Sequence, residues 1–269
     1  MTDSPADTRP ARIATFIEDR IGWLEVNNPA RKNAITLAMW QAIPKAVTEL
    51  AADPRVRVIV LRGAGEETFI AGADISEFAT LRKDAASARA YEASNAAAFD
   101  ALRNAPLPTL AMIRGFCLGG GFGLAAACDL RIAEDGASFG IPAARLGVGY
   151  PPTAIADVVR LLGPSRAKLL FFTARRIGVQ EAERFGFLDV VAPAGTLEAE
   201  ARRLAGEIAS GAPLTLRAAR AGIDALTARL SGDELAACQA LADTCFDSRD
   251  FVEGRTAFME KRAPEFTGN

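Results

Sequence analysis

Almost continuous apolar runs alternate with helical patterns through much of this chain, and this alternation constrains the fold more than any other feature. The run at 56–61 is apolar apart from one arginine, which is typical of a strand buried on both faces of a sheet. A helix is predicted over 85–103, where alanine is abundant, and a second strand over 109–116. Strands interleaved with helices in this way predict an α/β core.

The N-terminal part of the core has its own local signals. The runs 13–17 and 21–26 are rich in β-branched and aromatic residues, with a polar pair between them, and predict a hairpin. Apolar residues at helical spacing predict a helix over 37–50. Pro44 lies inside that helix, so we expect its first half to be irregular or kinked.

Helical spacing dominates after residue 152, interrupted by one predicted strand over 188–191. The polar segment before the first strand lacks the apolar centre of a signal peptide. We therefore predict three parts: a disordered leader (1–11), an α/β core (12–195) and a helical C-terminal region (196–269).

Composition excludes several classes of protein. Half of the residues are hydrophobic and the formal net charge is −2, which argues against disorder and against a strongly basic nucleic-acid binder. The chain has no histidine, so a Ser-His-Asp triad and a histidine-ligated metal are excluded, and we expect no metal site. The four cysteines form no CxxC pair, and no stretch reaches the roughly 20 apolar residues of a membrane span. We therefore expect a cytoplasmic protein with no membrane or nucleic-acid partner.

Two glycine-containing loops, each after a predicted strand, are the strongest candidates for chemistry. Gly119-Gly120-Gly121 opens a short helix of small residues, and Ala71-Gly72-Ala73-Asp74-Ile75 leads into another helix. Either loop alone could be a tight turn that serves packing. Together they could present two backbone N–H groups to one oxygen atom, which is an oxyanion hole.

Several motifs occur in a recognisable order between residues 12 and 266. They are the segments 28–34, 71–75, 115–121, 128–133, 139–147, 253–254 and 258–262. On these motifs the chain resembles the crotonase superfamily, also called the enoyl-CoA hydratase/isomerase family. The resemblance implies a crotonase (ClpP-like) fold of repeated ββα units, with a helical C-terminal region used for trimerisation.

The resemblance also implies the substrate class and the site. Family members act on acyl-CoA thioesters in fatty acid metabolism, and they hold the thioester carbonyl between two backbone amides, which by motif are those of Ala73 and Gly120. Coenzyme A would be part of the substrate, with no permanently bound cofactor. The residues implied in its binding are Arg31, Lys32, Ala71, Gly72, Asp74, Ile75, Phe258 and Lys261. We expect a homotrimer or a dimer of trimers, in which a neighbouring subunit supplies the C-terminal contacts.

The chain departs from the family where hydratases carry two catalytic glutamates, because those positions are Gly123 and Ala143. Neither residue can transfer a proton, so we do not expect ordinary two-glutamate hydration. Tyr150 stands where the decarboxylase branch of the family has a tyrosine. Four possibilities remain: a hydratase or isomerase with another acid–base group, a malonyl-type decarboxylase that uses Tyr150, an enzyme of another enolate reaction, and a CoA-thioester-binding protein without chemistry.

Overall fold

The computed structural model describes residues 11–82, 85–150, 152–228, 244 and 248–269. Its strands are β1 (Arg12–Glu18), β2 (Ile21–Asn27), β3 (Val58–Gly63), β4 (Thr109–Ile113), β5 (Phe116–Leu118), β6 (Leu130–Glu134), β7 (Ser138–Gly140), β8 (Arg176–Gly178) and β9 (Val190–Ala192). Its α-helices are α1 (Leu37–Ala52), α2 (Phe78–Leu81), α3 (Ala85–Arg103), α4 (Gly120–Ala127), α5 (Ala143–Leu146), α6 (Pro152–Thr173), α7 (Val179–Arg184), α8 (Leu197–Ser210), α9 (Pro213–Ala228) and α11 (Arg249–Glu260). Two 3-10 helices, η1 (Pro29–Arg31) and η2 (Ile75–Glu77), complete the described elements.

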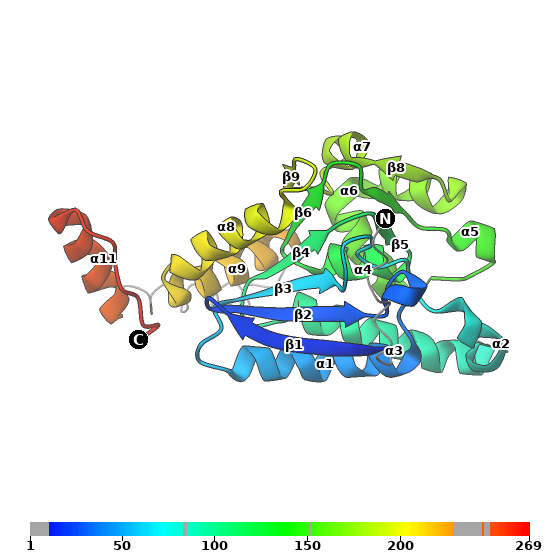
Figure 1. Ribbon diagram of the computed structural model, residues 1–269, viewed down its shortest axis with the longest axis horizontal. Helices are drawn as coiled ribbons and strands as arrows, with labels where there is room; N and C mark the ends of the chain where they lie inside the picture. The colour runs from blue at the N-terminus through cyan, green and yellow to red at the C-terminus, as the bar shows by residue number, and fades with distance from the viewer. Residues whose placement is uncertain (1–10, 83–84, 151, 229–243, 245–247) are drawn as a thin grey trace, which may run out of the picture.

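The strands form two sheets (Figure 1). The larger sheet has the order β1-β2-β3-β4-β6-β9, with β1 antiparallel to β2 and every other neighbour parallel. The smaller sheet has the order β5-β7-β8. Helices α1 and α3 lie on one side of the larger sheet and α8 lies on the other (Figure 1). The predicted α/β class is therefore confirmed.

Both faces of the larger sheet are buried. On β3, Val58 and Val60 pack with Leu197 of α8, whereas Ile59 and Leu61 belong to the core cluster on the other face. Because successive side chains of a strand point to opposite faces, a strand covered on both sides must be apolar at nearly every position. This is the physical reason for the unbroken apolar run in the sequence.

The first helix corrects one expectation. The predicted hairpin is present as β1 and β2, but α1 is a continuous helix from Leu37 to Ala52 despite Pro44. An interior proline costs a helix about 3 kcal/mol, whereas burying one large apolar side chain contributes about 1.5–3 kcal/mol. Trp40 and Ile43 are fully buried on α1, so packing offsets the cost of the proline.

The predicted strand over 109–116 is also corrected, because it is two strands in different sheets. Gly115 lies between them with φ of 57°, in the left-handed region, and a β-carbon there would lie 1.9 Å from the carbonyl oxygen of Glu67. The chain therefore turns at Gly115, leaving β4 in the larger sheet and sending β5 into the smaller one. This turn delivers the glycine run to the end of β5.

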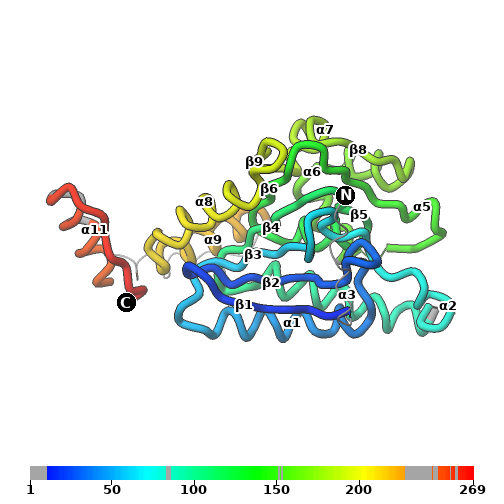
Figure 2. The backbone as a smooth tube through the Cα atoms, viewed as in Figure 1, coloured from blue at the N-terminus to red at the C-terminus, as the bar shows by residue number. Residues whose placement is uncertain are grey.

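Two short elements, β8 and α5, were not predicted, and the strand expected at 188–191 is β9, displaced toward the C-terminus. Residues 1–10 of the predicted leader lie outside the described residues, so the three-part division stays a prediction. Two of the four cysteines, Cys238 and Cys245, also lie outside the described residues. Figure 2 shows α11 beyond α8 and α9, at the opposite end of the molecule from α2 and α5. Within the described part of the chain, none of the helices has the length and apolar composition that crossing a bilayer requires.

Candidate active site

A cavity is lined in part by residues of α2 and α5, the two helices at one end of the molecule in Figure 1. The loop at 71–73 and the residues Gly119 and Gly120 form one side of it. Arg82 and one face of α3 form another side, and Ala143 and Tyr150 also line the cavity. The structure therefore brings both predicted amide loops and Tyr150 to a single cavity.

The backbone N–H groups of Ala73 and Gly120 border the same space. An isolated parallel bridge joins Ile35 to Ala73, in which Ile35 N donates to Gly72 O and Asp74 N donates to Ile35 O, each at 2.9 Å. This pattern leaves the N–H of Ala73 outside the bridge. Gly120 is the first residue of α4, so its N–H has no acceptor within the helix. A β-carbon added to Gly120 would lie 3.8 Å from Ala73 N, which shows how closely the two segments approach.

All three glycines of the run are required by geometry. Gly119 has φ of 52°, a region that favours glycine. A β-carbon on Gly120 would lie 2.7 Å from the Trp40 ring, and one on Gly121 would lie 2.4 Å from Ile70 O. The glycines thus allow the close packing that brings the amide of Gly120 beside the loop at 71–73. The same close packing therefore serves both possibilities raised by the sequence, a tight turn and the presentation of an amide to the cavity.

Tyr150 is half-buried, and its ring packs edge to face against Phe171 with centroids 5.4 Å apart. A β-carbon on Gly119 would lie 3.6 Å from its hydroxyl oxygen, so the hydroxyl is close to the glycine run. Burial raises the pKa of Tyr150 to about 12, and the nearby Glu92 carboxylate adds to this while Arg82 opposes it. The phenol is therefore neutral near pH 7, a form that can donate a hydrogen bond.

A polar cluster on the cavity wall was missed by the sequence analysis. Arg82 pairs with Glu92 at 2.6 Å, and Asn95 Nδ2 donates to the second carboxylate oxygen at 3.3 Å. The guanidinium of Arg82 lies over the rings of both Phe78 and Tyr91, 4.3 and 4.2 Å from their centroids. Burial raises the pKa of Glu92, with Arg82 and then Asn95 opposing the shift. The sequence did contain a signal for this cluster. Glu92 and Asn95 lie at helical spacing with the apolar Phe99 in an alanine-rich helix, so these polar residues share a face with an apolar one.

The two positions at which the resemblance predicts glutamates are Gly123 and Ala143. Gly123 lies on α4, and a β-carbon there would lie 2.7 Å from the tip of the Phe99 ring. Phe99, from α3, therefore fills the space that a side chain at 123 would enter. Ala143 is buried and lines the cavity with its methyl group.

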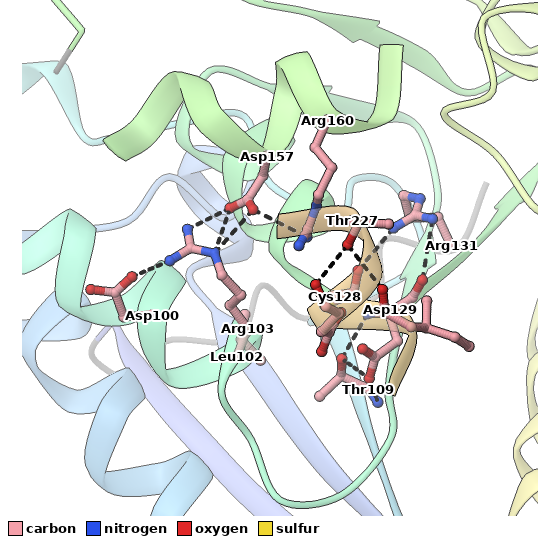
Figure 3. A network of polar contacts seen from close by, with 12 residues as sticks. Asp100, Leu102, Arg103, Thr109, Cys128, Asp129, Arg131, Asp157, Arg160 and Thr227 are labelled. Atoms are coloured by element: carbon pink, nitrogen blue, oxygen red, sulfur yellow. Dashed lines mark hydrogen bonds and ion pairs between the residues drawn. The ribbon is translucent and has the colours of Figure 1, made fainter. Parts of the chain in front are cut away.

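The position of α3 is held by an ion pair with α6, the helix that begins just after Tyr150. Arg103 donates from Nε to both carboxylate oxygens of Asp157, at 3.0 and 3.1 Å, and Arg160 lies 3.2 Å from the same carboxylate (Figure 3). Asp157 is buried, so this contact is shielded from solvent. It fixes the cavity-lining face of α3 relative to the segment that carries Tyr150.

The predicted coenzyme A residues near the cavity are in part engaged with each other. Arg31 Nη1 lies 3.1 Å from Asp74, whose carboxylate also accepts from Ser76 N at 3.0 Å. Burial opposes ionisation of Asp74, but the hydrogen bonds from Ser76 and the charge of Arg31 together lower its pKa. Lys32 and Ile75 are exposed at this rim, with Ile75 63% exposed although apolar.

The two predicted C-terminal contacts lie elsewhere. Phe258 is on α11 and Lys261 follows that helix, which is at the opposite end of the molecule from the cavity (Figure 2). The side chain of Phe258 is outside the described residues, whereas Lys261 is exposed. A single chain does not bring these residues to the site.

Comparison with known proteins gives consistent matches. The family model for enoyl-CoA hydratase/isomerase matches residues 17–269. A crotonyl-CoA hydratase of Syntrophomonas wolfei is 35% identical over 252 residues, covering 93% of this chain and 95% of the relative. A short-chain-enoyl-CoA hydratase of Clostridium acetobutylicum is 32% identical, covering 92% and 94% respectively. The crystal structure of an enoyl-CoA hydratase/carnithine racemase from Magnetospirillum magneticum superposes with a TM-score of 0.90 at 36% identity, covering 96% of each chain.

Proposed function

The chain belongs to the enoyl-CoA hydratase/isomerase family, and from that premise we propose that it processes acyl-CoA thioesters through an enolate held by the backbone amides of Ala73 and Gly120. The observation that carries this proposal is the approach of two N–H groups, neither with an acceptor among the described residues, at one cavity. Each such donor contributes about 3–4 kcal/mol to stabilising a developing oxyanion.

The proposed reaction is the reversible hydration of a short 2-enoyl-CoA. Relatives named as a crotonyl-CoA hydratase and a short-chain-enoyl-CoA hydratase support this choice. Addition of water at C3 places negative charge on the thioester oxygen, where the two amides stabilise it. Tyr150 would contribute a neutral hydroxyl near Gly119, able to donate to the acyl group or to water.

Coenzyme A binding is proposed along the rim formed by the 71–75 loop and Lys32. The exposed Ile75 offers an apolar surface, and Lys32 offers a cation that does not pair with a carboxylate among the described residues. Arg31 is turned toward Asp74, so we assign it first to holding this loop. Contacts from Phe258 and Lys261 would require a neighbouring subunit, which is the reason to propose a homotrimer or a dimer of trimers.

Decarboxylation of a malonyl-type thioester is the second candidate. Loss of CO₂ generates the same enolate without a base, and the placement of the Tyr150 hydroxyl beside Gly119 favours it. A non-catalytic thioester-binding protein is the third candidate, favoured by the residues at Gly123 and Ala143.

An assay panel tests these alternatives. Loss of the conjugated enone absorbance of crotonyl-CoA is the expected result, and release of CO₂ from methylmalonyl-CoA would assign the decarboxylase. Infrared difference spectroscopy of bound butanoyl-CoA should show the thioester carbonyl stretch at a lower frequency than in water. An unshifted carbonyl would refute the two-amide contact, and tight binding without turnover across the panel would assign the non-catalytic role.

A further inference from the structure

The cavity contains few groups that can move a proton. Among the described residues that line it, the titratable side chains are Arg82, Glu92 and Tyr150, and Glu92 carries the only carboxylate. Arginine stays protonated near neutral pH, and the pKa of Tyr150 is raised to about 12. By elimination, Glu92 is the group able to accept and return a proton.

Helix α3 explains how the carboxylate reaches this place. Glu92, Asn95 and Phe99 follow at spacings of three and four, so they share one face of the helix, and all three line the cavity. Phe99 occupies the space in front of Gly123. One helix thus closes the position on α4 where a glutamate is absent and presents another carboxylate to the same cavity.

We propose that Glu92 is the acid–base residue of this protein, with Arg82 and Asn95 as its positioning residues. The inference rests on the proposed enolate chemistry and supplies the proton-transfer group that this chemistry needs. Arg82 contacts one carboxylate oxygen of Glu92, and Asn95 donates to the other, so the orientation of the carboxylate is fixed. The side chain of Glu92 is 20% exposed, so it remains accessible from the cavity. The buried Oδ1 of Asn95 has no hydrogen-bond partner among the described residues, which indicates a polar position completed by water or substrate.

Burial and the charged and polar groups around Glu92 set its pKa. Burial raises its pKa above the ordinary value, Arg82 and Asn95 limit the rise, and the Glu92 charge in turn raises the pKa of Tyr91 and of Tyr150. A carboxylate with a raised pKa is a better base, and once protonated it remains a competent acid. The result is a group suited to taking a proton and returning it in one turnover.

For hydration, the step balances with water as the only co-reactant. The Glu92 carboxylate takes a proton from water, the water oxygen bonds to C3, and the C2=C3 electron pair moves toward C1 to place charge on the thioester oxygen. The enolate then collapses as C2 takes the proton from the Glu92 carboxylic acid. The product is a 3-hydroxyacyl-CoA, and Glu92 is again a carboxylate.

The test compares Glu92→Gln with wild type in the hydration of crotonyl-CoA. The variant should lose about 10²–10⁴-fold in kcat, with KM changed far less, while the carbonyl shift of bound butanoyl-CoA is retained. Glu92→Asp should recover part of the loss. Glu49→Gln is the matched control, because Glu49 is an exposed helical glutamate that pairs with Lys45 on α1; it should keep full activity.

The outcomes separate this inference from the proposed function. A wild type that does not hydrate crotonyl-CoA overturns both the proposed hydration and the role of Glu92, and a missing carbonyl shift separately refutes the two-amide contact. A wild type with turnover, together with a folded Glu92→Gln variant of equal kcat, overturns only the role of Glu92. Should Glu92→Gln fail to fold because Arg82 is left unpaired, the wild-type pH profile decides: kcat/KM should fall on the acid side with an apparent pKa above 4.5, the ordinary value, and a profile without that fall overturns the proposal.

Discussion

Replacing Gly123 by alanine tests the claim that Phe99 fills the space at this position. The added β-carbon would lie 2.7 Å from Phe99 Cζ and 3.0 Å from Cε1. Unstrained carbon–carbon contacts lie at about 3.5–4.0 Å, so an overlap of about 1 Å has to be relieved. Phe99 has little freedom to move, because it is 4% exposed and packs edge to face on Trp40.

The two energetic effects of the substitution have opposite signs. Overpacking of this kind costs about 1–3 kcal/mol, whereas alanine stabilises a helix interior by about 1 kcal/mol relative to glycine. We therefore expect Gly123→Ala to lower the free energy of unfolding by about 1 kcal/mol. In a Phe99→Leu background the ring tip is gone, so only the helix term remains and the same substitution should raise stability by about 1 kcal/mol.

The coupling between the two positions is the measured quantity. Urea unfolding of wild type, both single variants and the double variant, at one protein concentration, should give a coupling of about 2 kcal/mol. The fixed concentration matters because subunit association would add to apparent stability. Additive effects within about 0.5 kcal/mol would refute the contact, as would a stabilising Gly123→Ala in the wild-type background.

Two further predictions concern the rim of the cavity. Asp74→Asn should destabilise the protein at neutral pH, because the variant lacks the charge that pairs with Arg31. The difference in Tm from wild type should shrink as pH falls through the lowered pKa of Asp74, because the wild-type carboxylate then becomes neutral too. A difference in Tm that stays constant with pH would contradict this. Lys32→Ala should raise KM for crotonyl-CoA about tenfold, which is the effect of losing one charge-assisted hydrogen bond. The KM for crotonyl-pantetheine, which lacks the nucleotide part of coenzyme A, should be unchanged. Equal effects on both substrates would show that Lys32 does not bind coenzyme A.

Local signals predicted much of the scaffold. The bounds expected for α3 are those observed, and the hairpin of β1 and β2 and the short helix α4 after the glycine run are present. These predictions succeeded because periodicity, turn residues and glycine act within a few residues of chain. Helix α1 shows the limit of such signals, since the disfavoured Pro44 is tolerated only because Trp40 and Ile43 are buried.

Elements that depend on distant partners were predicted poorly. The strand expected at 109–116 divides because Gly115 turns against the carbonyl of Glu67, a contact that no local pattern contains. Strand β8 and helix α5 are too short to show a period, and β8 is ordered by pairing with β7. Sheet membership of this kind is a property of the assembled chain.

The amino-acid sequence alone identified the family and, through the resemblance, predicted two amide-bearing loops and the absence of the expected glutamates at Gly123 and Ala143. Only the tertiary structure decided that Glu92 lies in the same cavity as those loops. Helical spacing places Glu92 on one face with Asn95 and Phe99, but it does not say what that face meets. That choice is made by Phe99 packing in front of Gly123 and by the ion pair that joins α3 to α6, both of which are contacts between segments far apart in the chain.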